Sequence, residues 1–478
     1  MKSLPADPLD GITLAEFGRR LRAGSISSES IARAYLERIA LLEPKISAFV
    51  YVAMETAIEQ ARAVDRLLAS GTDLGPLMGV PVAIKDLFTV DGMPRPRCGS
   101  SVDISDIVEG EGEFVRRVKR AGCVILGKTR MTEFAAGLVN VKHVTPWNPV
   151  DAKVHRMPGG SSGGSAAALA AGMCAFSIGS DTGGSVRHPA AMCGLFGYKS
   201  TYGWWPTDGA VPLSTTLDSI GTFTRSAADA ALVYAVLSAR PVPPRRGVKG
   251  LRLGRPNRHY FEELAPDVSE ATEAALRVLA NAGVEIVPME APETAEIDAV
   301  FGPVVTVELL ALLGRERFLA AKDVLDPIVW NRGEPLLDYR ATDYVRARRR
   351  LEALVRIARE RMRGLDGWVT ATTPDTAVPL EEHRTPEKAA AWIRRGTRNT
   401  RPGNMFGQCG VSLPIAGADL PAGLQIVCAP GEDERLLSIS QGVEERLGVA
   451  ARADMWRFLS ARRPRRGPRS SAPGRSSR

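Results

Sequence analysis

Residues Met157–Ser200 read MPGGSSGGSAAALAAGMCAFSIGSDTGGSVRHPAAMCGLFGYKS and contain two clusters of glycine and serine. The clusters are Gly159–Ser165 and Gly179–Ser185, and a run of small residues joins them. Glycine reaches positive φ without strain and lets another backbone or a ligand approach closely, so each cluster predicts an exposed backbone surface that carries serines. Two such surfaces are typical of an acyl-transfer site.

The residues between the clusters predict a helix followed by a strand. Ala166–Met173 is rich in alanine, which has the highest helix propensity and lets neighbouring elements pack closely. Ala175–Ile178 is a short apolar run that is typical of a buried strand. The chain would run from loop to helix to strand to loop, with Ser185 just after the strand. This order allows the serines of the two loops to meet.

The whole pattern resembles the signature of the amidase signature family of serine hydrolases. GGSSGGSAAALAAG is followed by GSDTGGSVRHPAAMCG, and this pair is long enough to be specific. The resemblance covers roughly Thr13–Leu447 and is weakest over 242–367. Further segments similar to family segments are Gly79–Phe88 (GVPVAIKDLF), Gly127–Ala135 (GKTRMTEFA), Thr145–Asp151 (TPWNPVD), Tyr202–Gly203, Asp218–Gly221 and Leu420–Gln425 (LPAGLQ).

The resemblance implies an amide hydrolase with a triad of Lys85, Ser161 and Ser185. In the family pattern Ser185 is the nucleophile, Ser161 follows a cis peptide bond and relays protons, and Lys85 is the terminal base. The chemistry of these residues agrees, because a serine needs a base, and a lysine acts as one only when burial or another cation lowers its pKa. Lys85 follows the apolar run Val80–Ile84, which predicts a buried strand. Taken alone, a lysine followed by an aspartate is more often a solvated pair.

Backbone amide groups beside the nucleophile are the expected binding site for the oxyanion. The resemblance implies that the N–H groups of Thr182, Gly183, Gly184 and Ser185 form this hole, and that Ser162 supports it by hydrogen bonding. Glycines leave such amide groups free to point at a developing negative charge. Ser185 could instead cap the helix that follows it. This chemistry requires neither a metal nor a cofactor, so neither is expected.

A methionine, a histidine and a pair of adjacent tryptophans are candidates for contact with the substrate. Met131 lies in the segment that follows the lysine segment, and His188 follows the nucleophile where relatives commonly have an aliphatic residue or an amide. Trp204 and Trp205 stand in a loop that ends at a proline and could form an aromatic wall. The competing interpretations are a buried histidine with satisfied ring nitrogens and a pair of tryptophans that pack beside the site.

Three other motifs are rejected on context. Gly122–Thr129 matches the P-loop expression, but its middle residues are themselves the predicted strand. Val82–Lys85 matches the kinase lysine strand, yet the chain lacks His-Arg-Asp and Asp-Phe-Gly. Gly160–Gly164 matches a nucleophile elbow with Ser162 as nucleophile. That interpretation needs a later acid and then a histidine, and no catalytic context surrounds the later histidines, which are His188, His259 and His383.

Composition indicates a globular protein with a large core. The chain has 478 residues, of which 44% are hydrophobic, and its six cysteines show no disulfide or zinc spacing. Neither a signal core nor a membrane span is recognisable, so a cytoplasmic location is expected. The net charge is +8, but Ala461–Arg478 contains seven arginines and no acid, so the rest of the chain is nearly neutral. The composition of this tail predicts disorder, and its arginines could bind nucleic acid weakly.

The predicted fold is α/β, with the amidase-signature architecture of a mixed central sheet covered by helices on both faces. One amidase signature domain is expected over 1–460, followed by the basic tail at 461–478. Within the domain, a catalytic core spans about 75–240 and a more variable middle region about 242–367. The N-terminal helical layer is predicted at Leu14–Arg22, Glu29–Leu42 and Met54–Ser70, and a final helix is predicted at Asp433–Leu447.

Three functions remain open from the sequence. The first is hydrolysis of a small carboxylic amide through an acyl-enzyme, by an enzyme that acts alone or as a homodimer. The second is the A subunit of a glutamine-dependent tRNA amidotransferase, which needs partner subunits. That subgroup commonly has a Ser/Glu/Asn-rich stretch where this chain has AAGLVNVKHV at 135–144, which makes this interpretation weaker. The third is a binding protein that acts through its basic tail.

Overall fold

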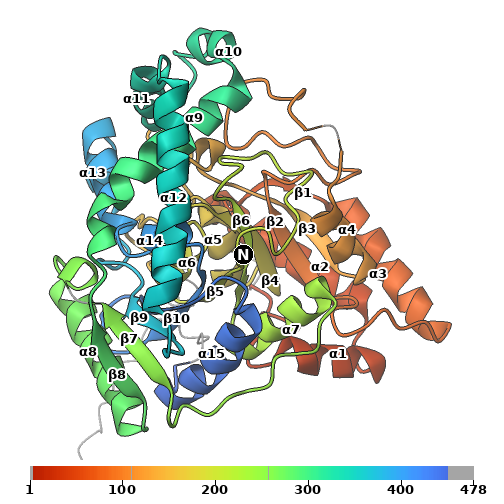
Figure 1. Ribbon diagram of the computed structural model, residues 1–478. Helices are drawn as coiled ribbons and strands as arrows, with labels where there is room; N and C mark the ends of the chain where they lie inside the picture. The colour runs from red at the N-terminus through yellow and green to blue at the C-terminus, as the bar shows by residue number, and fades with distance from the viewer. Residues whose placement is uncertain (1–3, 109, 257, 450–478) are drawn as a thin grey trace, which may run out of the picture.

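In the computed structural model, which describes residues 4–108, 110–256 and 258–449, eleven strands form one mixed sheet (Figure 1). The strands lie side by side in the order β1-β3-β2-β4-β6-β5-β10-β11-β9-β7-β8. Their bounds are β1 Phe49–Val52, β2 Pro81–Lys85, β3 Val124–Thr129, β4 Phe176–Asp181, β5 Phe196–Lys199, β6 Ser219–Thr224, β7 Arg252–Pro256, β8 Glu285–Met289, β9 Gly367–Ala371, β10 Cys409–Ile415 and β11 Ala422–Cys428. The predicted mixed α/β fold is therefore confirmed.

Helices cover this sheet and extend beyond one end of it (Figure 1). The helices are α1 Leu14–Arg22, α2 Ser28–Ile46, α3 Met54–Ala69, α4 Glu113–Arg120, α5 Gly163–Ala170, α6 Arg187–Cys193, α7 Ala227–Ser238, α8 Pro266–Asn281, α9 Ile297–Leu313, α10 Arg315–Ala320, α11 Pro327–Gly333, α12 Ala341–Arg361, α13 Pro386–Gly396, α14 Arg401–Met405 and α15 Asp433–Leu447. The pair α5 and α6 packs on the central strands, as does the pair α7 and α15. The group α9–α12 lies together in the chain, at 297–361.

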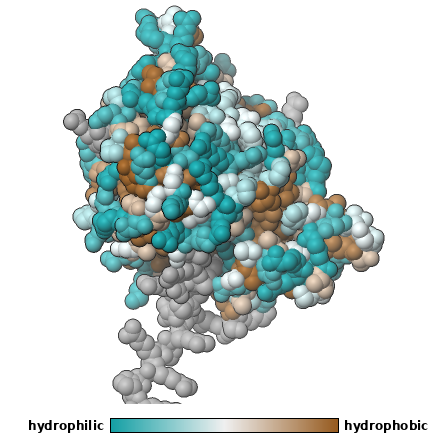
Figure 2. All heavy atoms as spheres, turned by 60° about the horizontal axis from the view of Figure 1, so that its bottom comes forward, coloured by the Kyte–Doolittle hydropathy of each residue, from teal (hydrophilic) through white to brown (hydrophobic). Residues whose placement is uncertain are grey.

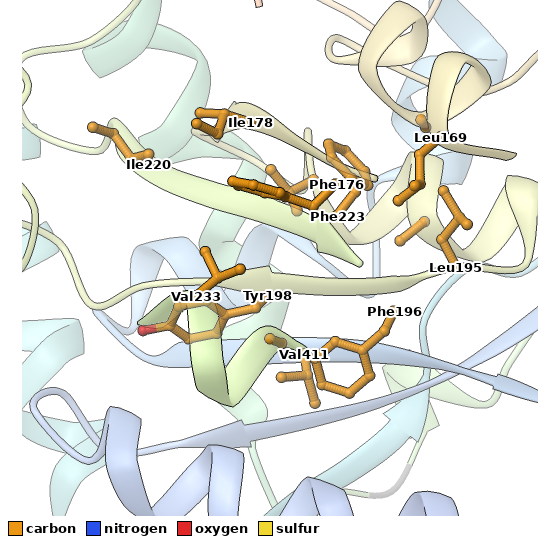
Figure 3. Packing of buried hydrophobic residues seen from close by; sticks show 14 of the residues in the cluster. Leu169, Phe176, Ile178, Leu195, Phe196, Tyr198, Ile220, Phe223, Val233 and Val411 are labelled. Atoms are coloured by element: carbon orange, nitrogen blue, oxygen red, sulfur yellow. The ribbon is translucent and has the colours of Figure 1, made fainter. Parts of the chain in front are cut away.

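The central strands form the core of the molecule. β2 pairs in parallel with both β3 and β4, and all three strands are buried at every residue. Strands buried on both faces read as continuous apolar runs, which is how β2 appears in the sequence. Figure 3 shows Phe176 and Ile178 of β4 packing with Phe223 of β6 and Leu169 of α5. The first glycine and serine cluster leads into α5, and the second continues from the end of β4.

The outer parts of the chain follow ordinary helix signals. α1 and α15 have the predicted bounds, and α2 begins after Ser27, whose side chain accepts a hydrogen bond from Ser30 N in a capping box.

Hydrophilic residues cover much of the face in Figure 2, and hydrophobic residues form smaller areas on it. In the described ranges, every helix is too short or too polar to cross a lipid bilayer. The predicted basic tail, 461–478, lies outside the described residues.

Two elements near the site have bounds that differ from the prediction. α5 spans Gly163–Ala170 rather than Ala166–Met173, and β4 begins at Phe176 rather than Ala175. β4 continues to Asp181 instead of ending at Ile178, because Ser180 pairs with Ile220 and Asp181 with Ser219 of the antiparallel neighbour β6. Ser180 and Asp181 therefore stand in a strand and not in a loop. The pairing with β6, which is distant in sequence, could not be read from the local apolar pattern.

Candidate active site

Lys85 is the last residue of β2 and is completely buried. Its Nζ donates hydrogen bonds to Ser161 Oγ at 2.7 Å and to Ser180 Oγ at 2.8 Å. β2 and β4 run in parallel with Ile84 opposite Ile178, so their carboxyl ends bring Lys85 and Ser180 to the same edge of the sheet. This edge is where α/β sheets usually bind their ligands. The interpretation of Lys85 as part of a solvated pair is wrong.

The environment of Lys85 favours its neutral form. Burial lowers the pKa of Lys85 to about 7, although the carboxylates of Asp218 and Asp181 act in the opposite direction. A lysine with its ordinary pKa is charged at neutral pH and cannot accept a proton. Lys85 is therefore able to act as a base near neutral pH.

The first serine loop supplies two hydroxyl groups with different partners. The peptide bond between Gly160 and Ser161 is cis, as the resemblance implied. Ser161 Oγ lies against Lys85, whereas Ser162 Oγ donates to the carbonyl of Ser180 at 3.2 Å. The Ser162 amide also donates to the carbonyl of Ser185 at 3.4 Å. Ser162 thus connects the first loop to the second.

Ser185 lies in the connection between β4 and α6 and lines a cavity. Its side chain is mostly buried, at 6% exposure of the residue. In the described part of the chain no hydrogen bond joins the hydroxyl groups of Ser161 and Ser185. Catalytic hydrogen bonds are often long in unliganded proteins and tighten when substrate binds. The structure therefore joins Lys85 to Ser161 directly, whereas the Ser162 amide contacts only the backbone carbonyl of Ser185.

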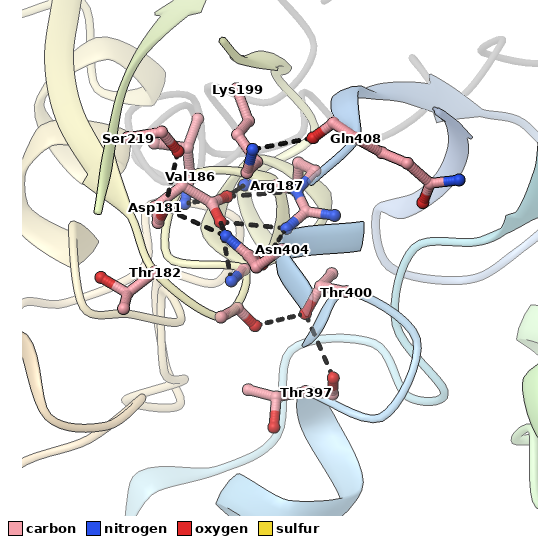
Figure 4. Close-up of polar contacts among 12 residues, drawn as sticks. Asp181, Thr182, Val186, Arg187, Lys199, Ser219, Thr397, Thr400, Asn404 and Gln408 are labelled. Atoms are coloured by element: carbon pink, nitrogen blue, oxygen red, sulfur yellow. Dashed lines mark hydrogen bonds and ion pairs between the residues drawn. The ribbon is translucent and has the colours of Figure 1, made fainter. Parts of the chain in front are cut away.

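Asp181 organises the turn that carries Ser185 (Figure 4). Its carboxylate accepts hydrogen bonds from the amide groups of Gly184, Val186 and Arg187, at 2.8, 3.1 and 3.3 Å. These amides lead into α6, where the first N–H groups have no partner inside the helix. Burial alone would raise the pKa of Asp181, but the charge and hydrogen bonds of Arg187 hold it well below its usual range. Asp181 is therefore a permanent anion that fixes this turn.

The role of Asp181 corrects one part of the predicted oxyanion hole. The amide of Gly184 already donates to Asp181 Oδ1, so it is not free for a substrate. Gly184 has φ of +123°, and a Cβ there would lie 2.0 Å from Thr400 Oγ1. Among the hydrogen bonds of the described residues, none uses the amides of Thr182, Gly183 or Ser185. These three groups remain the available donors.

The substrate-contact candidates lie elsewhere. His188 is buried edge-on against Trp392, with ring centroids 5.4 Å apart, and burial lowers its pKa to about 3. Trp204 stacks on Tyr234, and its Nε1 donates to Ser238 Oγ at 3.3 Å. Met131 is buried, and its carbonyl accepts a hydrogen bond from Asn140. None of the three lines the cavity at Ser185.

The rival nucleophile elbow finds no support in the contacts. Ser162 Oγ donates to a backbone carbonyl and contacts no histidine. His259 Nε2 and His383 Nδ1 lie 3.0 and 3.2 Å from backbone carbonyls, and within the described residues the ring nitrogens of His188 have no hydrogen-bond partner. A histidine positioned as general base for Ser162 is thus absent from the described residues.

A family model described as Amidase matches residues 30–437. The chain belongs to this family. Chains of known structure also align with most of its length.

Two relatives and one solved structure illustrate the range of the family. The chain is 36% identical over 448 residues to 2-amino-5-chloromuconic acid deaminase of Comamonas testosteroni, covering 91% of this chain and 96% of the relative. It is 32% identical over 479 residues to the A subunit of the glutamyl-tRNA(Gln) amidotransferase of Geobacter metallireducens, covering 91% and 97%. A crystal structure described as an amidase superposes with a TM-score of 0.83 at 32% identity, covering 91% of this chain and all of the other.

Sequence reasoning missed three residues of this candidate site. Ser180, the second acceptor for Lys85, stands inside the quoted signature and is signalled only by the extension of β4. Arg332 and Arg401 line the cavity beside Ser185. Neither arginine belongs to a recognisable sequence motif, and Arg332 lies in the middle region where the family resemblance is weakest. Their position depends on contacts between segments far apart in the chain.

Proposed function

We propose that this enzyme hydrolyses a carboxylic amide, with Ser185 as nucleophile and Ser161 and Lys85 as the proton relay. The observation that supports this most strongly is the buried Lys85 Nζ, 2.7 Å from Ser161 Oγ and with a pKa near neutrality. The cavity that Ser185 lines gives the substrate access to the nucleophile. The family match adds that relatives of this chain are amide hydrolases.

The first half-reaction forms an acyl-enzyme. Ser185 Oγ attacks the carbonyl carbon, its proton passes to Ser161 Oγ, and the proton of Ser161 passes to Lys85 Nζ. The amides of Gly183 and Ser185, with that of Thr182, stabilise the oxyanion, each donor contributing a few kcal/mol. The C–N bond then breaks, and the relay runs in reverse to protonate the leaving nitrogen, which departs as ammonia or an amine.

The second half-reaction restores the enzyme. Water attacks the acyl carbon and gives a proton to the same relay. The C–O bond to Ser185 then breaks, and the relay returns the proton to Ser185 Oγ. The product is the free carboxylic acid. Each proton taken up in one step is released in a later one, so the residues of this chain complete the cycle.

The experiment that tests this function is ammonia release from a panel of amides. The panel spans aliphatic amides, arylacetamides, dicarboxylic monoamides, urea-derived amides and glutamine. An amino-substituted muconic acid is added because one relative is a 2-amino-5-chloromuconic acid deaminase. Turnover of one class, lost in Ser185→Ala, supports the proposal. Full activity in Ser185→Ala, or no turnover of any compound by the wild-type chain, contradicts it.

A second candidate is the A subunit of a glutamine-dependent amidotransferase. Relatives that are the A subunits of glutamyl-tRNA(Gln) amidotransferases support it, because one aligns over 91% of this chain and 97% of its own length. Ammonia release from glutamine that requires added partner subunits would favour this candidate. Turnover of another amide by the purified chain alone would favour the first.

A further inference from the structure

Two arginines and no carboxylate line the cavity that opens at Ser185, within the part of the chain that the structure describes. Arg332 comes from α11 and Arg401 is the first residue of α14. Neither the triad nor the oxyanion hole uses them. A cavity in which cationic groups outnumber anionic ones is suited to an anionic part of a substrate.

The position of Arg401 is fixed by several partners. Its guanidinium forms an ion pair with Asp298, donates to Thr397 Oγ1 at 2.6 Å and lies 4.5 Å from the centre of the Phe301 ring. Arg401 itself is only 6% exposed. These contacts hold the side chain in place, so Arg401 contributes a fixed positive charge at the wall of the cavity.

Arg332 has a different environment. It is half-buried, and its Nη1 donates to the carbonyl of Ala136 at 3.1 Å. Among the described residues no carboxylate forms an ion pair with it. Burial, together with the charges of Arg401 and Arg394, lowers the pKa of Arg332 to about 10. A partly desolvated guanidinium with only a carbonyl partner gains strongly from an incoming anion.

The rest of the cavity wall strengthens such an interaction. Leu213, Phe301, Val305 and Ile393 line the same cavity. Apolar walls lower the local dielectric constant, so a charge pair inside them interacts more strongly than in water. A guanidinium also matches the two oxygens of a carboxylate by paired hydrogen bonds. The chemistry of the wall thus fits a short apolar chain that ends in a carboxylate.

We propose that Arg332, together with Arg401, binds a carboxylate on the acyl part of the substrate, so that preferred substrates are amides carrying a second, free carboxylate. This inference rests on the proposed amide hydrolysis. The preferred substrates would then include monoamides of short dicarboxylic acids as well as glutamine. Both carry a free carboxylate, but only glutamine also carries an α-amino group. Arg332 is then a residue that determines specificity.

The test compares charged and neutral substrates of the same length. Succinamic acid and butyramide differ in the terminal carboxylate, and kcat/KM is measured for both with wild type, Arg332→Met and Arg332→Lys. We expect wild type to favour succinamic acid, and Arg332→Met to lower the ratio of the two kcat/KM values by about a hundredfold. Arg332→Lys should restore part of the ratio, because the positive charge returns without the paired geometry.

Arg394→Met is the matched control. Arg394 lies close enough for its charge to affect Arg332, but it does not line the cavity. The Arg394→Met variant removes the same formal charge as Arg332→Met. It should leave the ratio of the two kcat/KM values within about threefold of wild type. An equal loss in Arg394→Met would show a general charge effect and would overturn the subsite. Equal hydrolysis of succinamic acid and butyramide by the wild-type enzyme would also overturn the subsite.

A binding measurement separates this inference from the proposed function. Succinate and glutarate are titrated by calorimetry into Ser185→Ala and into the same variant with Arg332→Met. Binding that requires Arg332 supports the subsite even if no amide is turned over, in which case only the hydrolytic function fails. Equal binding to both proteins, or binding to neither, overturns the subsite. Comparing succinamic acid with glutamine then identifies which carboxylated amide is preferred.

Discussion

Lys85 Nζ lies 2.7 Å from Ser161 Oγ, although 76 residues separate them in the chain. β2 carries the lysine to the edge of the sheet, and the loop before α5 carries the serine to the same place. Because both groups are buried, the lysine loses the hydration that would keep it charged. The contact is therefore a base beside a hydroxyl group, which is what proton transfer from a serine requires.

The pH dependence of amide turnover follows from this contact. Burial lowers the pKa of Lys85 to about 7, so below that pH the lysine is protonated and cannot accept a proton. We expect kcat/KM to rise with pH through an apparent pKa of about 7 and then to level off. Burial raises the pKa of Asp218 to about 6, so this carboxyl group also titrates within the pH range in which kcat/KM rises. A profile that is flat from about pH 5 to 9, or one that rises only near the ordinary lysine pKa, would contradict a buried lysine base.

Ser180→Ala should impair the base without removing it. The change deletes the acceptor 2.8 Å from Lys85 Nζ, which stabilises the charged form of the lysine. We expect kcat to fall about tenfold and the acidic limb of the pH profile to move to lower pH. Ser177→Ala is the matched control, because Ser177 is buried in the same strand and donates to the carbonyl of Ser165. If both variants lose the same activity and keep the wild-type pH profile, Ser180 has no role in positioning the base.

Arg187→Met should destabilise the fold strongly. The Arg187–Asp181 ion pair is completely buried, with Nη2 3.0 Å from Oδ1, and the change leaves the Asp181 carboxylate without its cation. Removing one partner of a buried pair typically costs about 3–5 kcal/mol in the free energy of unfolding. Urea denaturation measures the loss. Arg33→Met, which breaks an exposed pair with Glu29, should cost less than about 1 kcal/mol, and equal losses would show that the buried pair is not special.

The Arg187–Asp181 pair also predicts how wild-type stability depends on pH. The pKa of Asp181 is lower in the folded chain than in the unfolded one, so its contribution is fully present above the unfolded pKa of about 3.9. The contribution is lost as the pH falls below that value. Urea midpoints measured between about pH 3 and 7 should therefore decrease on the acidic side. In Asp181→Asn with Arg187→Met this decrease should be smaller, and an unchanged decrease would contradict the assignment.

Gly164→Ala should displace the first serine loop. An added Cβ would lie 2.4 Å from Arg130 O and 2.5 Å from Ala48 O, and both are backbone atoms that cannot rotate away. We expect a lower thermal midpoint and a loss of activity, because α5 must move and the loop with Ser161 moves with it. Gly302→Ala, also within a helix, meets nothing within 4 Å and should keep or raise the midpoint. A decrease of the thermal midpoint in both variants, or an increase in both, would contradict the packing argument.

The sequence was informative where a property is local. Apolar periodicity located α1 and α15 to the residue, and the resemblance identified Lys85 and Ser161, which the structure joins at one edge of the sheet. Properties set by distant partners could not be predicted. β4 extends to Asp181 because β6 pairs with it, and the Gly184 amide is occupied because Asp181 lies beneath the turn.

The substrate-binding residues illustrate the same limit. Trp204 is conspicuous in the sequence, but Tyr234 and Ser238 of α7 hold it away from the cavity. Arg332 is one of many arginines in a region of weak resemblance, and it reaches the site only because α11 packs near Ala136, 196 residues earlier in the chain. Side-chain chemistry can be read from a sequence, whereas the cavity into which it projects depends on the tertiary fold.

The measurement that most directly tests the central claim is covalent labelling of the nucleophile. An alkyl fluorophosphonate forms a bond from phosphorus to an activated serine oxygen and releases fluoride, without requiring knowledge of the natural substrate. Peptide mass spectrometry of the labelled wild-type chain should find the phosphonyl group on Ser185. The label should be absent from Ser185→Ala and should form far more slowly in Lys85→Met. Labelling at another serine, or equal labelling rates in wild type and Lys85→Met, would contradict the proposed triad.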